Sequence, residues 1–294
     1  MFKNLVSVVI PIYKEIPNEL EIISLKQCCK VLGHYPNRLI APFKLNTEYY
    51  EKICCNIKDL VVERFDDAFF ENIVGYNKLM LSSTFYKRFI KFKYILIYQL
   101  DAFVFRDDLK YWCNLGYDYI GAPWFEEWHN STSLSKIIGV GNGGFSLRNA
   151  QSILNHIKIL KKLQVIYKYE KYNWKGLLTR FYKIIYDVIF YKSYELQYKL
   201  TNGQEDYFWC LDMESLYNEY SNNKSFVAKL FKIKNTEKLK IADENNAIKF
   251  SFECQPSHLY KKNSKKLPFG CHAWQKYEYE FWKPFIEAEG YELP

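Results

Sequence analysis

An acidic residue follows the strongest apolar run of the chain. Residues 94–98 read YILIY, and Asp101 follows them after only Gln99 and Leu100. In open α/β sheets, ligands bind beyond the carboxyl ends of the strands, and a charge buried there is costly unless it is paired or bound to a metal. Asp101 is therefore predicted to be a ligand of a hard cation such as Mg²⁺ or Mn²⁺. The alternative is an aspartate that caps a turn or pairs with a lysine or arginine.

A glycine-rich segment follows further along the chain. Residues 139–144 contain four glycines and Asn142, and they come after the strand-like segment 118–124, which ends in Pro-Trp. Glycines let the backbone approach a ligand closely. The segment is not a P-loop, because no GK[ST] sequence follows it. It is not a dinucleotide-binding fingerprint either, because a strand is predicted after it where such a fingerprint needs a helix. A glycine-rich turn alone is weak evidence for a functional site, but its position soon after Asp101 strengthens that evidence.

Two later motifs carry titratable groups. Glu205 and Asp206 open an apolar helical run; acids at a helix start often only complement the helix dipole, but they are equally well placed to act as a general base. His272 lies in the segment FGCHAW and is either a core histidine or a ligand that contacts metal or phosphate. A zinc site with the nearby cysteines does not match the usual CxxC spacing.

The elements that must position these residues follow from the apolar pattern. Strands alternate with helices through residue 125, which predicts an α/β fold with a mixed, mostly parallel sheet flanked by helices. Gly33 is expected to end the first helix, and Asp107 and Asp108 are expected to cap a later one. The predicted strands cover residues 5–12, 38–41, 60–65, 94–98, 118–122 and 144–147, and the predicted helices cover residues 18–31, 47–57, 66–92 with a break at Gly75, and 150–200.

Composition excludes several classes of protein. The abundance of tyrosine (26) and phenylalanine (22) excludes a disordered chain, and no apolar run is long enough to span a membrane. The eight cysteines form no disulfide framework, so a cytoplasmic protein is expected. Of the net charge of +8, +7 falls in residues 151–200, which argues against a general nucleic-acid binder. This basic, aromatic segment predicts either a solvated helix face or peripheral contact with an anionic membrane at its inner face.

The motifs together resemble one family. VSVVIPIYK resembles the opening strand of GT-A-type glycosyltransferases. The blocks GYNKLMLSSTFYKRF, YILIYQLDAFVF, DYIGAPW, GNGGFSLR, QEDYFWC and FGCHAW resemble, in this order, a bacterial and viral family of GT-A-like proteins of the domain-of-unknown-function type, often linked to capsule or lipopolysaccharide biosynthesis. The resemblance covers residues 5–285 without the basic insert. It implies a single GT-A-like domain over residues 1–294, with a nucleotide-sugar half (1–125) and an acceptor half (126–294).

The resemblance also implies an activity. The protein is expected to move a sugar from a nucleotide-sugar, of which a UDP-sugar is the first choice, to a glycan or lipid-linked glycan acceptor, with inversion. Gln99-Leu100-Asp101 stands where the family type has its Asp-x-Asp metal motif, so the first acid is replaced and only Asp101 matches. Asp101 and His272 would hold Mn²⁺ or Mg²⁺, Asp206 would be the base, and Glu205 would orient the acceptor.

The remaining implied roles concern the two substrates. The implied donor-binding residues are Pro11, Tyr13, Asn77, Lys78, Gln99 and Asp101. The implied acceptor-binding residues are Trp124, Asn142, Gly143 and Gly144. Two other readings stay open from the residues alone: a metal-dependent phosphoesterase, which usually gathers more acids and histidines, and a non-catalytic nucleotide- or sugar-binding protein.

Overall fold

The computed structural model describes residues 4–169, 204–213 and 238–294, with isolated positions at 176, 180, 182–183, 186 and 218. The strands are β1 (Val6–Pro11), β2 (Asn37–Pro42), β3 (Leu60–Phe65), β4 (Tyr94–Tyr98), β5 (Phe103–Val104), β6 (Tyr119–Ile120), β7 (Ala122–Phe125), β8 (Ile137–Gly141), β9 (Phe145–Asn149), β10 (Ser251–Phe252) and β11 (Gly270–Cys271). The α-helices are α1 (Glu19–Leu32), α2 (Glu48–Ile53), α3 (Ile73–Met80), α4 (Ser83–Phe89), α5 (Leu109–Asn114), α6 (Ala150–Tyr169), α10 (Glu205–Tyr207), α13 (Glu244–Phe250), α14 (Pro256–Lys262) and α15 (Tyr279–Glu287).

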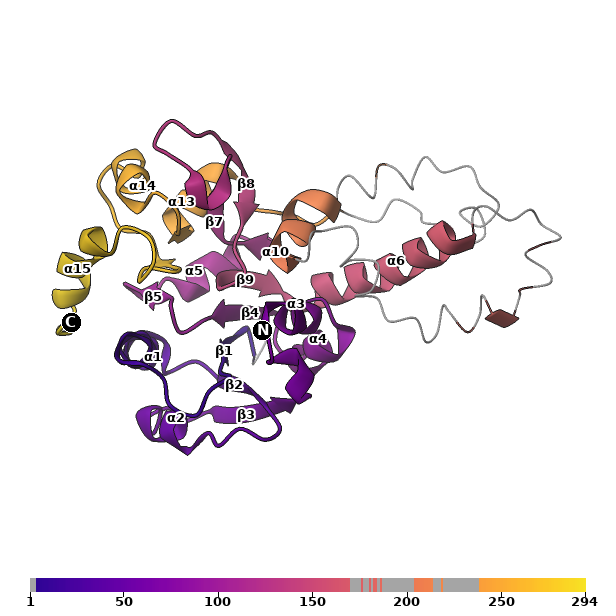
Figure 1. Cartoon of the computed structure of the whole chain (residues 1–294), viewed down its shortest axis with the longest axis horizontal. Helices are drawn as coiled ribbons and strands as arrows, with labels where there is room; N and C mark the ends of the chain where they lie inside the picture. Colours follow the sequence, from indigo (N-terminus) through magenta and orange to yellow (C-terminus); the bar gives the residue numbers. More distant parts are fainter. Residues whose placement is uncertain are drawn as a thin grey trace.

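The central sheet has the order β3-β2-β1-β4-β9-β6 (Figure 1). β1, β2, β3 and β4 run parallel to one another, whereas β9 is antiparallel to both β4 and β6. This is the mixed, mostly parallel sheet predicted from the sequence. Smaller sheets join β10, β11 and β5, and β7 with β8. Both predicted halves of the chain contribute to the central sheet, because β9 from the second half lies between β4 and β6 from the first.

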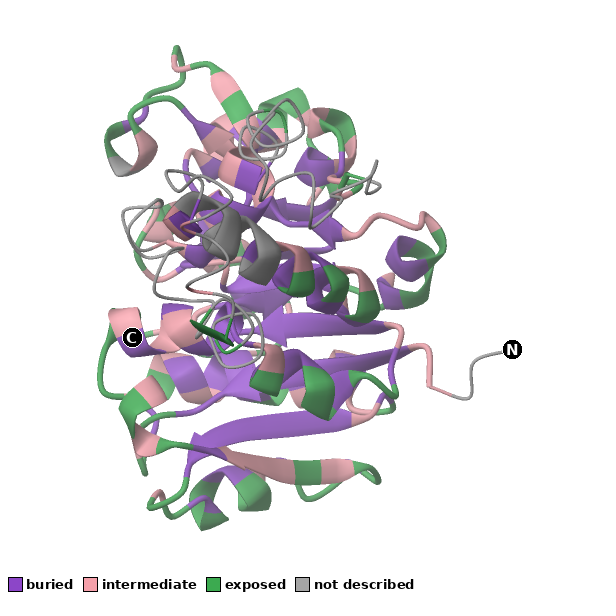
Figure 2. Ribbon diagram, turned by 90° about the vertical axis from the view of Figure 1, so that its right-hand side faces the viewer, coloured by how far each residue is buried: buried purple, intermediate pink, exposed green. Residues whose placement is uncertain are grey.

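Helices cover both faces of this sheet because its strands are apolar on both sides. Val8 and Ile10 of β1 pack with residues of α1 and α2, whereas Val9 packs with residues of α3, α4 and α6 on the other face. Figure 2 shows the resulting burial, with buried residues along the strands and exposed ones on the outer sides of the helices. The edge strand β3 is the least covered, with only Phe65 fully buried.

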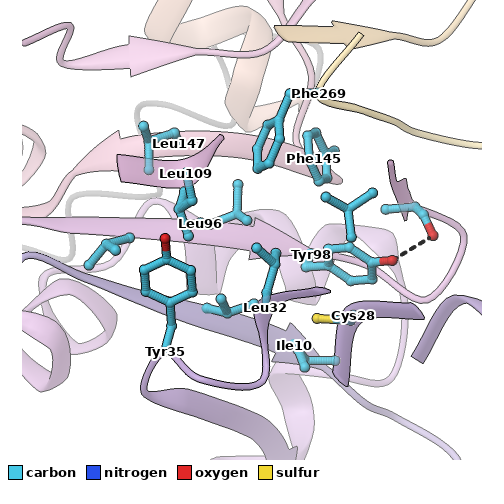
Figure 3. Close-up of a cluster of buried hydrophobic side chains, with 14 of the residues drawn as sticks. Ile10, Cys28, Leu32, Tyr35, Leu96, Tyr98, Leu109, Phe145, Leu147 and Phe269 are labelled. Atoms are coloured by element: carbon cyan, nitrogen blue, oxygen red, sulfur yellow. Dashed lines mark hydrogen bonds between the residues drawn. The ribbon is translucent and has the colours of Figure 1, made fainter. Parts of the chain in front are cut away.

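One buried hydroxyl fixes the end of β4. Tyr98 lies in the apolar cluster between the sheet and α1 (Figure 3). Its hydroxyl donates to the carbonyl oxygens of Ser24 and Ala102, at 2.9 and 3.1 Å. A buried tyrosine hydroxyl needs such partners. The two bonds hold the turn after β4, which contains Asp101, against α1.

Several predicted boundaries are confirmed. The segments 60–65 and 94–98 form strands over these residues. Helix α1 ends at Leu32 before Gly33, and at its start Asn18 and Glu21 form a capping box. Asp107 and Asp108 have structural roles, but Asp108 makes no side-chain cap; Asp107 accepts a hydrogen bond from Tyr35 instead.

The predicted helix break at Gly75 is wrong. Gly75 lies inside α3, and Asn72 caps this helix by accepting from the Gly75 amide. The glycine is needed for close packing, because a Cβ there would lie 2.3 Å from the carbonyl oxygen of Ala68. The glycine-rich segment is also only partly a turn, since Gly139 and Gly141 belong to β8.

Helix α6 continues directly from β9 and extends away from the sheet (Figure 1). It accounts for the first part of the helix predicted over residues 150–200. The rest of the basic segment, and with it most of the predicted membrane contact, lies outside the described residues. Within the described part of the chain, no helix has the length and apolar character to span a membrane.

Candidate active site

The site forms where the carboxyl ends of β1 and β4 meet the start of β9. Because β9 is antiparallel to β4, Tyr98 at the end of β4 pairs with Phe145 at the start of β9. The turn before β9 therefore lies beside the residues after β4, and the Gln99 amide donates to the Gly144 carbonyl oxygen at 2.8 Å. Two motifs that are far apart in the sequence meet here.

A second strand pair brings in the late histidine. β10 and β11 run side by side with Phe252 opposite Cys271, so the residues that follow them, Glu253 and His272, are neighbours. His272 Nε2 lies 3.1 Å from Asp101 Oδ1 and 3.2 Å from Gln99 Oε1. Its other ring nitrogen, Nδ1, lies 2.9 Å from Glu253 Oε1. The structure thus joins the predicted pair Asp101 and His272 and adds Glu253 behind it.

These contacts set the charges of the cluster. Burial alone would raise the pKa of Asp101, but His272 outweighs this effect and lowers it. Burial alone would lower the pKa of His272, but Asp101 and Glu253 together raise it to about 10. Both carboxyl groups therefore favour the protonated form of His272, and a cation that binds at Nε2 must displace its proton.

The donor atoms around His272 Nε2 decide whether a metal fits. Among the residues that the structure describes, no three His, Cys, Asp or Glu side chains gather in a way that would hold an ion. Glu253 cannot join Asp101 on one ion, because it contacts the opposite ring nitrogen. The set of one carboxylate, one imidazole and the Gln99 amide oxygen does fit a divalent cation that takes its remaining ligands from phosphate oxygens, as Mg²⁺ usually does.

The turn of Gly143 and Gly144 separates this cluster from a pair of acids. A Cβ on Gly144 would lie 1.9 Å from His272 Nε2. A Cβ on Gly143 would lie 2.9 Å from Glu205 Oε1 and 3.7 Å from Asp206 Oδ2. A side chain at Gly144 would overlap the imidazole ring, and one at Gly143 would press on the Glu205 carboxylate, so glycine is favoured at both positions. Asn142, with φ of 89°, shapes the turn by accepting from the amides of Gly144 and Phe145, each at 2.9 Å.

Gly144→Ala is expected to displace the His272 ring and to lower the free energy of unfolding by about 1–3 kcal/mol, as overpacking does. Urea unfolding measures the effect. His272→Ala removes the ring that the new methyl group meets, so the double variant Gly144→Ala/His272→Ala should lose less than the sum of the two single losses. Additive losses would contradict the close contact.

Glu205 is held by a buried ion pair. The Arg148 guanidinium donates from both of its terminal nitrogens to the two carboxylate oxygens of Glu205, at 2.7 and 2.9 Å, and the side chains are 0% and 2% exposed. Arg148 also donates to the hydroxyl of Tyr86 and to the Gly143 carbonyl oxygen. The Glu205 amide donates to Asn77 Oδ1. Glu205 therefore anchors the start of α10 to β9, with both oxygens occupied.

Asp206 has a different environment. Burial and the adjacent Glu205 carboxylate raise the pKa of Asp206 to about 7. Helix α10 continues as a short π-helical turn over Phe208–Asp212, a feature that is frequent at functional sites. A carboxyl group that titrates near neutral pH is suited to general base catalysis.

Two adjoining cavities meet at this point. The larger, of about 490 Å³, is lined by Pro11 at the end of β1 and Tyr13 beyond it, by Gln99 and Asp101 after β4, and by residues near the start of α3. The smaller, of about 270 Å³, is lined by both glycines of the turn, Asp206, Glu253, His272 and Trp124. Gln99, Ile73 and Tyr76 line both. Asp101 lines the larger cavity and His272 lines the smaller one, so their cluster lies where the two cavities adjoin.

A family model covers most of this site. Residues 59–272 match the model described as protein of unknown function, DUF5672. The chain belongs to the DUF5672 family. This membership confirms the resemblance to a family of the domain-of-unknown-function type. The DUF5672 segment contains Asp101, the glycine turn, the acidic pair and His272, whereas Pro11 and Tyr13 of the larger cavity precede it.

Solved structures of glycosyltransferases are similar in part to this DUF5672 chain. A galactosyltransferase, LgtC, in complex with donor and acceptor sugar analogs has a TM-score of 0.46 and 11% identity, with 96% of this chain and 95% of that chain covered. The glycosyltransferase GlyE of Streptococcus pneumoniae has a TM-score of 0.43 and 13% identity, with 97% of this chain covered; this chain spans 61% of GlyE. These values assign no activity to the DUF5672 chain. A search of curated proteins gives no significant match.

Most, but not all, of the residues singled out in the DUF5672 sequence gather here. Asn77 lines the smaller cavity and accepts a hydrogen bond from the amide of Glu205, and its place beside the nucleotide stays a prediction. Lys78 is not among the residues that line either cavity. Asn142 is buried and acts through the turn. The sequence predicted neither Arg148 nor Glu253; a charged residue next to the strand predicted over residues 144–147 is the one sequence signal that would have indicated Arg148.

Proposed function

We propose that the protein is a glycosyltransferase that transfers a sugar from a nucleotide-sugar donor to a hydroxyl group of a glycan or lipid-linked glycan. The donor class that we take first is UDP-sugar, and the larger cavity would hold its nucleotide. The smaller cavity would hold the acceptor.

One observation supports this proposal above the others. The glycine turn has the His272–Asp101 cluster against Gly144 and the Glu205–Asp206 pair against Gly143. The cluster that would face the leaving phosphate and the carboxyl group that would accept the proton therefore lie on the two sides of one short turn. Transfer from a nucleotide-sugar needs both groups near the same anomeric carbon.

The proposed reaction is a displacement at the anomeric carbon. The acceptor oxygen forms a bond to this carbon, the bond to the diphosphate oxygen breaks with its electron pair, and the hydroxyl proton moves to Asp206. A base placed apart from the leaving group favours direct displacement with inversion. Glu205 would not take the proton, because Arg148 occupies both of its oxygens; its role toward the acceptor would be indirect, through the position of Asp206.

Charge on the leaving diphosphate must be offset. Asp101, His272 and Gln99 are the residues that would hold Mn²⁺ or Mg²⁺, which would supply this positive charge. His272 is oriented for the role by Glu253, since a carboxylate on the far ring nitrogen fixes the ring that faces a metal.

A thermal-shift panel of nucleoside diphosphates with and without Mn²⁺ or Mg²⁺ tests the proposal. At about a hundredfold excess over its dissociation constant, the correct nucleotide should stabilise the wild-type protein by about 2.7 kcal/mol. The shift should depend on metal and be lost in Asp101→Asn, while Asp108→Asn, which removes a partner of Arg106 on the surface, should retain it. No shift with any nucleotide, or no sugar transfer from the corresponding donor, would contradict the proposal.

A further inference from the structure

The hairpin of β7 and β8 carries two tryptophans to the smaller cavity. Trp124 of β7 and Trp128 in the connecting segment both line it together with Asp206. Their ring centroids are 4.5 Å apart, with the planes nearly perpendicular. Tyr207, the residue after Asp206, stacks on Trp128 at 5.2 Å and contacts Trp124 at 5.7 Å. The two tryptophans thus form an aromatic wall that is packed against the same short helix as the proposed base.

The backbone that presents Trp128 is strained. Glu127 and Trp128 have φ values of 65° and 50°, in the left-handed region that non-glycine residues rarely adopt. Such conformations persist only where the surrounding structure fixes them, and they cluster at ligand-binding sites. Here the Gln255 side-chain amide donates to the carbonyl oxygen of Ser131 and ties the hairpin to α14. Trp128 remains only half-buried, so this strain does not place it in the core.

The lining of the cavity combines two kinds of contact. Aromatic faces lie beside carboxyl and amide groups, namely those of Asp206, Glu253 and Gln204. The negative face of an aromatic ring attracts the positively polarised C–H edge of a neighbour, and a pyranose presents such C–H groups on one face and hydroxyl groups around its rim. The volume of about 270 Å³ is below the range of roughly 300–1,000 Å³ of sites for drug-sized ligands, which suits a single ring.

We propose that Trp128, supported by Trp124 and Tyr207, is the platform on which a pyranose ring of the acceptor stacks while Asp206 faces its reactive hydroxyl. The acceptor is then a carbohydrate, and its terminal sugar is what the smaller cavity recognises. This inference rests on the proposed function, because that function makes the smaller cavity the acceptor site.

Saturation-transfer NMR with methyl β-D-glucopyranoside and methyl β-D-galactopyranoside, in the presence of UDP, tests the platform. At least one glycoside should receive saturation on the C–H groups of one ring face. Trp128→Ala should weaken its binding about tenfold or more, as removal of a central tryptophan does at binding hot spots. Trp128→Phe should retain most of the binding. Tyr111→Ala removes a tyrosine that is 54% exposed on α5 and should bind as the wild type does.

The outcomes separate this inference from the proposed function. The platform is overturned if Trp128→Ala and the wild type bind equally well. It is also overturned if the wild type binds neither glycoside up to about 50 mM, which corresponds to a standard binding free energy weaker than about 2 kcal/mol. UDP binding measured by thermal shift reports on the larger cavity in the same variants and should be unchanged. If no nucleoside diphosphate binds while Trp128 still governs glycoside binding, the proposed function fails and the sugar platform stands.

Discussion

Asp206→Asn is expected to lower kcat for sugar transfer by about 10²- to 10⁴-fold, the usual contribution of a positioned general base. Asparagine has nearly the same shape but cannot accept the proton of the attacking hydroxyl. Nucleotide binding, measured by thermal shift, should be retained, because Asp206 does not line the larger cavity. Asp212→Asn is the matched control, since it makes the same change at the end of the following π-helical turn and should leave kcat near the wild-type value.

The dependence of Asp206 on pH gives a second readout. Its pKa is raised to about 7 by burial and by Glu205, so the wild-type kcat/KM should fall about tenfold for each pH unit below 7. Between about pH 4 and pH 7, Asp206 stays protonated in the folded state, whereas in the unfolded state, where its pKa is about 3.9, it releases the proton. Stability due to this group is therefore present below about pH 4 and is lost as the pH rises to 7.

It follows that Asp206→Asn should raise the urea midpoint relative to wild type more at pH 8 than at pH 5. Loss of activity would then accompany a gain of stability, as expected for a group that is retained for function. Full transfer activity in the variant, or a stability difference that is the same at both pH values, would contradict the assignment of Asp206 as the base.

The second large effect is expected at Arg148. Arg148→Met leaves Glu205 buried without its partner, and breaking a buried ion pair in this way costs about 3–5 kcal/mol of unfolding free energy. Urea unfolding measures this loss. Arg88→Met is the matched control, because Arg88 and Glu63 form an ion pair with Arg88 45% exposed, and such surface pairs contribute only about 0–1 kcal/mol.

A double variant separates stability from positioning. Arg148→Met/Glu205→Leu has no buried charge left at this position and should recover much of the stability lost by Arg148→Met. Its kcat should stay low, because the start of α10 is no longer tied to β9 beside Gly143. A double variant with restored stability and wild-type kcat would show that the pair has only a structural role.

The sequence predicted the parallel part of the fold well because a buried strand has a simple pattern. Residues 60–65 and 94–98 are short apolar-rich runs between turn residues, and their strand bounds agree with the prediction. The carboxyl end of such a strand is a general ligand site in α/β proteins. This rule indicated Asp101, whereas Pro11 and Tyr13 were implied only by the family resemblance; all three line the larger cavity.

The parts that the sequence did not predict depend on tertiary pairing. Arg148 and Glu205 come together only because β9 is antiparallel and α10 packs against its start, and no local pattern in either segment indicates the partner. Gly75 reads locally as a helix breaker, but it permits contact with Ala68. The left-handed backbone at Glu127 and Trp128 was not predicted either, because neither residue type favours that conformation.

The position of β4 in the middle of the central sheet also has a consequence for shortened forms of the protein. The segment that matches the family model starts at residue 59 and lacks β1 and β2. Without them, β3 has no partner and β4 loses the neighbour that pairs with Val6 through Val9. Two apolar strands would then present unpaired backbone groups, which is the feature that drives strand-to-strand aggregation. A fragment that starts at residue 59 is therefore expected to aggregate through these two strands.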